Sequence, residues 1–134
     1  MNKVILMLIL IGLLSFFGWI LLRTKPQFDL YDEAKILNEG DSYHSHSYKV
    51  NNQNIIGRNF TGTDTFLAIE GDQTVIITID ISRSKGQVRV VWISPNHEIY
   101  DLKSGQNELH LMAGKHRFKV IGNQTDFELS YRIQ

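Results

Sequence analysis

An unbroken apolar run near the N-terminus constrains this chain more than any other feature. Val4 to Leu22 comprises 19 residues without a charge and with a single hydroxyl group. As an α-helix rising about 1.5 Å per residue it would extend roughly 28 Å, which matches the hydrocarbon thickness of a bilayer. Lys3 precedes the run, and Arg23 and Lys25 follow it. The pattern predicts a membrane anchor with its flanks over residues 1–25.

A cleaved secretory signal begins in a similar way and is the alternative to an anchor. The apolar run is longer than the usual signal core, and residues 19–22 are bulky where a signal peptidase requires small ones, so an uncleaved anchor is favoured. The three-residue N-terminal tail is typical of a signal-anchor, whose C-terminal side lies outside the cell. The basic residues after the run favour the opposite orientation. We expect a single-pass protein of the cell membrane with an extracytoplasmic C-terminal domain.

Composition limits the classes of partner and chemistry. The 14 basic and 14 acidic residues cancel, so no long-range field attracts nucleic acid and we expect no such partner. The chain has no cysteine, which excludes disulfides and cysteine-ligated metal or redox centres. The many Lys, Ile and Asn residues are typical of bacterial proteins. The roughly 95–110 residues that follow the anchor suit one domain.

A short acidic segment, residues 26–40, follows the anchor as a predicted linker. Pro26 prevents the first helix from continuing. Three apolar residues of the segment then fall at helical spacing: Leu30, Ala34 and Leu37. With Asp29 as the N-cap and Gly40 at the end, this spacing fits a short juxtamembrane helix, and an irregular spacer fits equally well.

From Asp41 onward the hydrophobic pattern alternates with a period of two, which is typical of strands with one buried face. Turn signals separate the segments, among them Ser84-Lys85-Gly86 and Gly122-Asn123. The expected strands are Ser42–Val50, Ile55–Phe60, Thr65–Glu70, Thr74–Ser82, Gln87–Ile93, His97–Leu102, Asn107–Met112, Lys115–Ile121 and Thr125–Ile133. No segment of helical period interrupts them. Residues 41–134 are therefore predicted to form a single all-β domain, an antiparallel β-sandwich of jelly-roll type.

The order of strands and turns in about the last 70 residues resembles the jelly-roll modules called pre-peptidase C-terminal domains. The matching pieces are Phe66–Gly71, Val75–Ile81, Trp92–Asn96 with Glu98, Ala113–Lys115 leading into Phe118–Val120, and Phe127–Leu129. His97 stands where the family's turn has glycine, and His116 and Phe118 lie near the position of its usual tyrosine. The resemblance implies a sandwich fold and a role as an accessory or binding module, with no catalytic residue to carry over.

His44 and His46 are the sharpest local sign of metal chemistry. Residues i and i+2 of a strand share a face, so both imidazoles could approach one metal ion. A zinc site needs three or four ligands, and the third would have to come from elsewhere in the chain. The candidates for it are Asp41, His97, His110 and His116. Two polar residues on a solvated strand face are the alternative explanation.

A second candidate is a basic strip made of Lys115, Arg117, Lys119 and Arg132, with Arg132 placed on a neighbouring strand. Such a strip could bind an anionic envelope polymer, lipid headgroups or a protein partner. Lysines that protect an edge strand from mispairing explain the same residues. Tyr43 and Tyr48 are expected on opposite faces of one strand, so they would not form a joint stacking platform.

Nothing in the sequence assembles a catalytic set. No serine lies in a Gly-x-Ser-x-Gly turn, no glycine-rich phosphate loop is present, and the carboxylates are scattered over turns and outward strand positions. We therefore expect no catalytic residue and no cofactor. The sequence favours a non-enzymatic, membrane-anchored binding module, with a His-dependent metal-binding or hydrolytic domain as the alternative.

Overall fold

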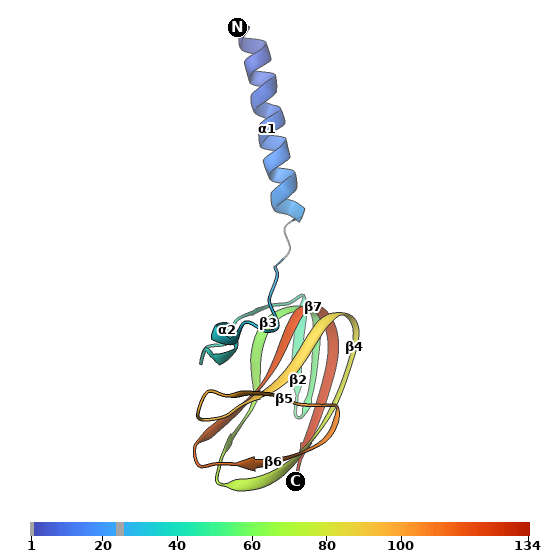
Figure 1. Cartoon of the computed structure of the whole chain (residues 1–134). Helices are drawn as coiled ribbons and strands as arrows, with labels where there is room; N and C mark the ends of the chain where they lie inside the picture. Colours follow the sequence, from blue (N-terminus) through green and yellow to red (C-terminus); the bar gives the residue numbers. More distant parts are fainter. Residues whose placement is uncertain (1, 24–25) are drawn as a thin grey trace.

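The structure, a computed structural model, describes residues 2–23 and 26–134, with the side chains of residues 16–23 outside the described part. Helix α1 spans Lys3–Arg23, and the short helix α2 spans Glu33–Leu37. Seven strands follow: β1 Tyr43–His44, β2 Ser47–Asn51, β3 Asn54–Glu70, β4 Gln73–Ile93, β5 Ile99–Asp101, β6 Gly105–Leu111 and β7 Lys115–Ile133. Figure 1 shows α2 lying beside the strands. Among the residues described, no helix is both long enough and apolar enough to cross a membrane.

The predicted all-β class is confirmed, because every helix or strand from Tyr43 onward is a strand. Every pair of neighbouring strands is antiparallel. Three long strands form the centre of the sheet in the order β3-β7-β4. The four short strands line its margins: β1 and β2 pair with β3, and β5 and β6 pair with β4. Each long strand joins two segments that the sequence analysis separated, so the expectation of many short strands is wrong for the centre of the sheet.

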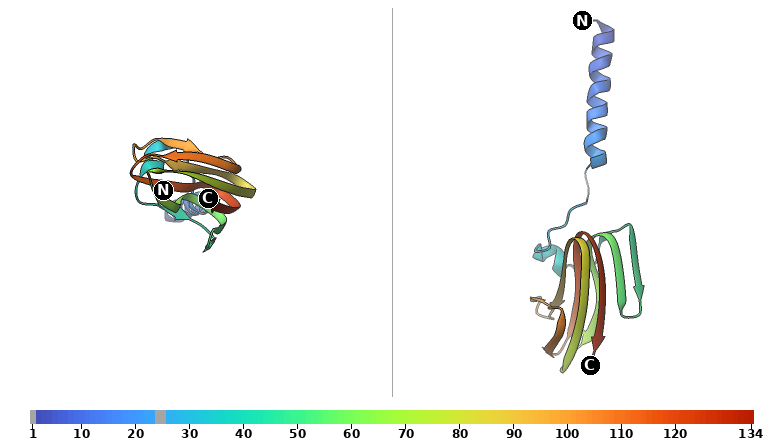
Figure 2. Two further views of the ribbon diagram at one scale, coloured as in Figure 1. Left: turned by 90° about the horizontal axis from the view of Figure 1, so that it is seen from below. Right: turned by 90° about the vertical axis from the view of Figure 1, so that its right-hand side faces the viewer.

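A line of irregular pairing, which we call the crease, crosses the three long strands. It comprises residues 59–62 of β3, 84–87 of β4 and 122–125 of β7. The register shifts on both sides of Phe60 in β3 and of Lys85 in β4. The three sites are neighbours, since Phe60 pairs with Thr125, and Gln87 pairs with Asn123. Bulges bend a strand and increase its twist, so the sheet folds over at this line (Figure 2).

Unusual backbone conformations are concentrated at the crease. Asn59, Gly86 and Gln124 have positive φ angles of 50°, 72° and 48°, a region that few residues other than glycine adopt. A Cβ atom on Gly86 would lie 2.2 Å from the carbonyl oxygen of Gln124. Glycine therefore lets β4 and β7 approach each other where both strands bend.

The folded sheet encloses one hydrophobic core, as in a β-sandwich. Ile55 and Phe127, on one side of the crease, belong to the same buried cluster as Val90 and Phe118, on the other side. The alternation within Thr74–Ser82 follows the core, with Val75, Ile77 and Ile79 buried and Ile81 packed against the cluster. Trp92 also belongs to this core, on the same face of β4 as Val88 and Val90.

A second, smaller core lies on the outer face of the sheet and holds α2. Ile36 of α2 is buried, and so is Leu30 before it. Both pack with Val91, Ile93 and Ile121 of β4 and β7. Asp32, rather than the expected Asp29, caps the helix by accepting from the backbone N–H of Lys35. The segment predicted to be a linker therefore contributes side chains to the core of the domain.

Two glycine substitutions distinguish the free-energy cost of backbone strain from the cost of a close approach between strands. Gly62 and Gly105 both have positive φ, but a Cβ on Gly62 would lie 2.2 Å from the Ser42 carbonyl oxygen, whereas Gly105 has open space. We predict that Gly105→Ala costs about 1 kcal/mol of unfolding free energy from conformation alone. Gly62→Ala should cost about 3 kcal/mol, because β1 must also move. Chemical denaturation followed by circular dichroism measures both, and equal losses would contradict the close approach.

Candidate functional site

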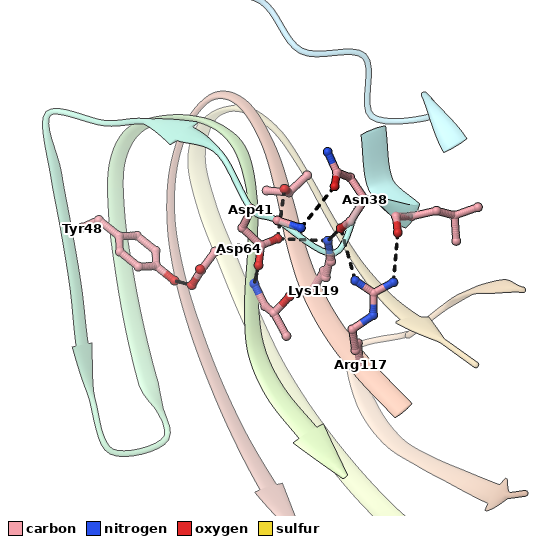
Figure 3. Close-up of polar contacts among 10 residues, drawn as sticks. Asn38, Asp41, Tyr48, Asp64, Arg117 and Lys119 are labelled. Carbon is pink, nitrogen blue, oxygen red and sulfur yellow. Dashed lines mark hydrogen bonds and ion pairs between the residues drawn. The ribbon is translucent and has the colours of Figure 1, made fainter. Parts of the chain in front are cut away.

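Lys119 of β7 is the most unusual polar residue of the domain, because its side chain is completely buried. Its Nζ donates to Asp41 Oδ1 at 3.0 Å and to the backbone carbonyl of Asn38 at 2.7 Å (Figure 3). The residue lies on the outer face of β7, where the segment after α2 covers the sheet. A buried ammonium is tolerated only when it is paired and hydrogen-bonded. The Lys119–Asp41 pair therefore fastens the segment after α2 onto the sheet.

The Asp41 carboxylate is held as an acceptor by several donors. Thr63 Oγ1 donates to Oδ1, and the backbone N–H of Thr65 donates to Oδ2, each at 3.1 Å. Burial alone would raise the pKa of Asp41. The hydrogen bonds from Thr65 and Lys119, together with the Lys119 charge, outweigh burial and hold this pKa below its ordinary value. Asp41 consequently remains ionised in the folded protein at neutral pH.

Arg117 fastens the end of α2 from the neighbouring outward position of β7. Its guanidinium donates to the carbonyls of Leu37 at 3.0 Å and of Asn38 at 3.2 Å. The last carbonyls of a helix lack partners within the helix, and a cation there also interacts favourably with the helix dipole. Lys119 and Arg117 together therefore satisfy the C-terminal end of α2.

A second carboxylate lies on the other side of this network. Asp64 accepts a hydrogen bond from the Tyr48 hydroxyl. Burial and the negative charge of Asp41 raise the pKa of Asp64, against the opposing effects of Tyr48 and Lys119. Burial and the bond to Asp64 also raise the pKa of Tyr48, so the phenol stays protonated and serves as the donor.

The tyrosines of the first two strands lie together, contrary to prediction. The ring centroids of Tyr43 and Tyr48 are 4.9 Å apart, and both rings lie within 5.3 Å of the Phe60 ring. A single strand over Ser42–Val50 would have placed the two side chains on opposite faces. The chain instead breaks between β1 and β2, which resets the alternation.

The structure does not assemble the predicted basic strip. Lys119 is buried in its ion pair, and Arg117 is engaged with α2. Arg132 belongs to β7 itself rather than to a neighbouring strand, and it lies beyond the crease, opposite Thr78. The alternative of a protected edge is also wrong, since β7 is flanked by β3 and β4.

Part of the strip does line a pocket. A cavity of about 450 Å³ is lined by Glu39, Ser94, Pro95, His97, Lys115 and Arg117. One wall is the 94–98 turn, in which the backbone N–H of His97 donates to the Ser94 carbonyl at 3.0 Å and His97 has a φ of 62°. Lys115 is exposed. Two cationic side chains and an imidazole against one carboxylate make this pocket suited to an anionic group.

The histidines do not form the expected arrangement. His44 ends β1 and His46 precedes β2, so the prediction that one strand aligns them is wrong. His116 is buried, and each of its two ring nitrogens makes a hydrogen bond. Its Nδ1 accepts from Trp92 Nε1 at 3.0 Å, and its Nε2 donates to the Met112 carbonyl at 2.7 Å. In the part of the chain that the structure describes, no three His, Asp or Glu side chains are placed to hold a metal ion.

Comparison with protein-family models, with curated proteins and with solved structures finds no match to this chain. What the fold defines is the class: an all-β, sandwich-like domain that follows an N-terminal apolar helix. The buried ion pair had one sequence signal that could have been used. Lys119 stands between Phe118 and Val120 in an alternating segment, which places it on the outer face of the strand. Only the position of α2 shows that this face is covered.

The Lys119–Asp41 pair gives a direct test of stability. We predict that Lys119→Met destabilises the domain by about 2 kcal/mol, because it removes the charge-assisted hydrogen bonds of the buried ammonium to Asp41 and to the Asn38 carbonyl. The double variant Asp41→Asn/Lys119→Met should lose at least about 1 kcal/mol less than the sum of the two single variants. Urea denaturation measures each value. The matched control is Lys103→Met at an exposed lysine, and strictly additive losses would contradict the coupling.

The pKa of Asp41 predicts how stability depends on pH. Because this pKa is lower in the folded state, the carboxylate stabilises the fold above its ordinary value of 3.8, and that stability is lost as pH falls through the folded value. Asp64, whose pKa is raised, acts in the opposite direction. Asp41→Asn should therefore be less stable than wild type at neutral pH but lose less stability on acidification. Thermal melts between about pH 6 and pH 2 test this, and parallel pH curves would contradict it.

Proposed function

We propose that this protein is a membrane-anchored, non-enzymatic binding module whose sandwich domain captures an anionic group of a protein or envelope polymer. The observation that carries the anchor is the uncovered apolar surface of α1. Ten large apolar side chains between Val4 and Leu14 are each 51–65% exposed. Burying that surface in hydrocarbon would contribute on the order of 10 kcal/mol. Residues 4–15, whose side chains the structure describes, are too few to span a bilayer alone, and the sequence continues the apolar run to Leu22.

The domain favours binding over catalysis. In the described residues, the strongest polar network, built on Asp41 and Lys119, is used to fasten α2. The 94–98 turn, Lys115 and Arg117 leave an accessible pocket in which basic groups outnumber the single carboxylate. This balance suits a carboxylate or a phosphate. We further propose a single-pass topology, an extracytoplasmic location and a jelly-roll arrangement of the strands. The resemblance to pre-peptidase C-terminal modules supports the role of a binding module. The metal-dependent alternative has no supporting arrangement in the described residues.

Alkaline carbonate extraction of the full chain from liposomes tests the anchor. We expect the protein to stay in the membrane fraction and to float with the vesicles. The control is a variant with four leucines of α1 replaced by Gln, which should be extracted because each buried amide costs several kcal/mol in hydrocarbon. Recovery of the unchanged protein in the aqueous fraction would contradict the anchor. If α1 were instead covered by a second copy of the chain, the extracted protein would be a dimer in the aqueous fraction.

Titration of the reconstituted protein with a fluorescent oligoglutamate and with a glycerol phosphate polymer tests the pocket. Lys115→Gln should weaken binding about tenfold, since a charge-assisted hydrogen bond is lost, and added salt should weaken it further. Lys103→Gln is the matched control. This site would be contradicted if neither probe bound, or if the two variants lost the same affinity.

A further inference from the structure

The crease is where the domain meets the chain that leads from α1. Three hydrogen bonds tie residues 26–28 to it. Gln124 Nε2 donates to the Pro26 carbonyl at 3.0 Å, and the backbone N–H of Phe28 donates to Asn123 Oδ1 at 3.2 Å. Asn123 Nδ2 also donates to Gln27 Oε1 at 3.3 Å. The first residues after α1 are therefore fixed on the bent end of the sheet.

Covalent geometry then places the crease close to the end of α1. Arg23 ends the helix, and Pro26 is three residues further along. Three residues span at most about 11 Å. If α1 is embedded in a bilayer, as the proposed function requires, this end of the domain lies at the level of the headgroups.

A cavity of about 560 Å³ opens at this end of the sheet, beside Pro26. Its polar side chains are one ammonium, four carboxamides and one hydroxyl, with no carboxylate among the lining residues. They are Lys85, Asn59, Gln87, Asn123, Gln124 and Thr61. Amide and ammonium donors suit a phosphate diester and the hydroxyls attached to it. The composition therefore resembles a polar headgroup site rather than an apolar one.

Lys85 is the charged group of this cavity. Its Nζ contacts Asn59 Oδ1 and lies 4.0 Å from Asp126 Oδ1. An ammonium has three donors, so these two contacts leave capacity for a third partner, and the side chain is half-exposed. A second groove, also lined by residues 26–28, adds Lys35 and His44 to the same end of the domain.

The backbone of the cavity is also unusual. Three of the four crease residues with positive φ line it: Asn59, Gly86 and Gln124. Sparsely populated backbone conformations persist only where the surrounding structure enforces them, and they are concentrated at ligand sites. Here they let three strands converge on one small volume.

We propose that the crease cavity binds the phosphate headgroup of an anionic phospholipid, with Lys85 as the principal cation and the surrounding amides as donors. This inference rests on the proposed anchor, since only an embedded α1 places the cavity at headgroup level. Headgroup binding would hold the sandwich upright on the membrane and orient the Lys115 pocket relative to the bilayer.

Native mass spectrometry of the full chain in nonionic detergent, with equal amounts of phosphatidylglycerol and phosphatidylcholine, tests the headgroup site. We expect wild type to retain the anionic lipid about fivefold more than the neutral one. Lys85→Gln should abolish that preference, whereas Lys103→Gln should leave it unchanged. Equal retention of both lipids by wild type, or equal loss in the two variants, would overturn the proposal.

Two controls separate the explanations. Protein that resists alkaline extraction but shows no lipid preference would overturn the headgroup site alone, whereas protein extracted by alkali would overturn the anchor and this inference together. Free glycerol 1-phosphate provides the soluble source of the same chemistry. If it binds in the absence of lipid as tightly as the phospholipid does, the cavity is a soluble-phosphate site and the headgroup assignment is wrong.

Discussion

The bend shared by β3, β4 and β7 is the constraint on which the rest of the domain depends. A flat sheet of three strands, each 17 to 21 residues long, would leave both of its faces exposed to solvent. Because the bulges lie at one level, the two halves close over the cluster that contains Ile55, Phe118 and Phe127. Closure puts the chain's point of attachment to α1 at one end and leaves an outer face free for α2.

Charge on the outer face serves mainly to hold α2 in place. The pairing of Lys119 with Asp41 and the bonds from Arg117 to the end of α2 join a five-residue helix to the sheet. A helix of that length is not stable alone, so its position depends on Ile36 and on these cations. The same arrangement fixes Arg117 at the edge of the pocket that Lys115 and His97 line. Structural and candidate binding residues thus lie on the same face of one strand.

Alternation in the sequence predicted the class of fold and most inward residues, but not which segments join. In β4 the inward phase changes from odd positions, as at Ile79, to even positions, as at Val90. A turn and a bulge both produce such a change, and both use residues such as Gly86 and Asn123. Only the partner strand, which bends at the same level, distinguishes a bulge from a turn. Likewise, the burial of Lys119 depends on α2, whose five residues give a weak periodic signal.

The proposed anchor determines where the proposed binding surfaces act, because the pocket beside Lys115 and the crease cavity lie at a membrane only if α1 is embedded in it. The absence of native cysteine allows a single spin label at Leu10→Cys in the reconstituted full chain. Power-saturation electron paramagnetic resonance then compares collisions with oxygen, which concentrates in hydrocarbon, and with a water-soluble nickel complex. The account predicts that oxygen relaxes the label strongly and nickel hardly at all. Strong relaxation by nickel would contradict it.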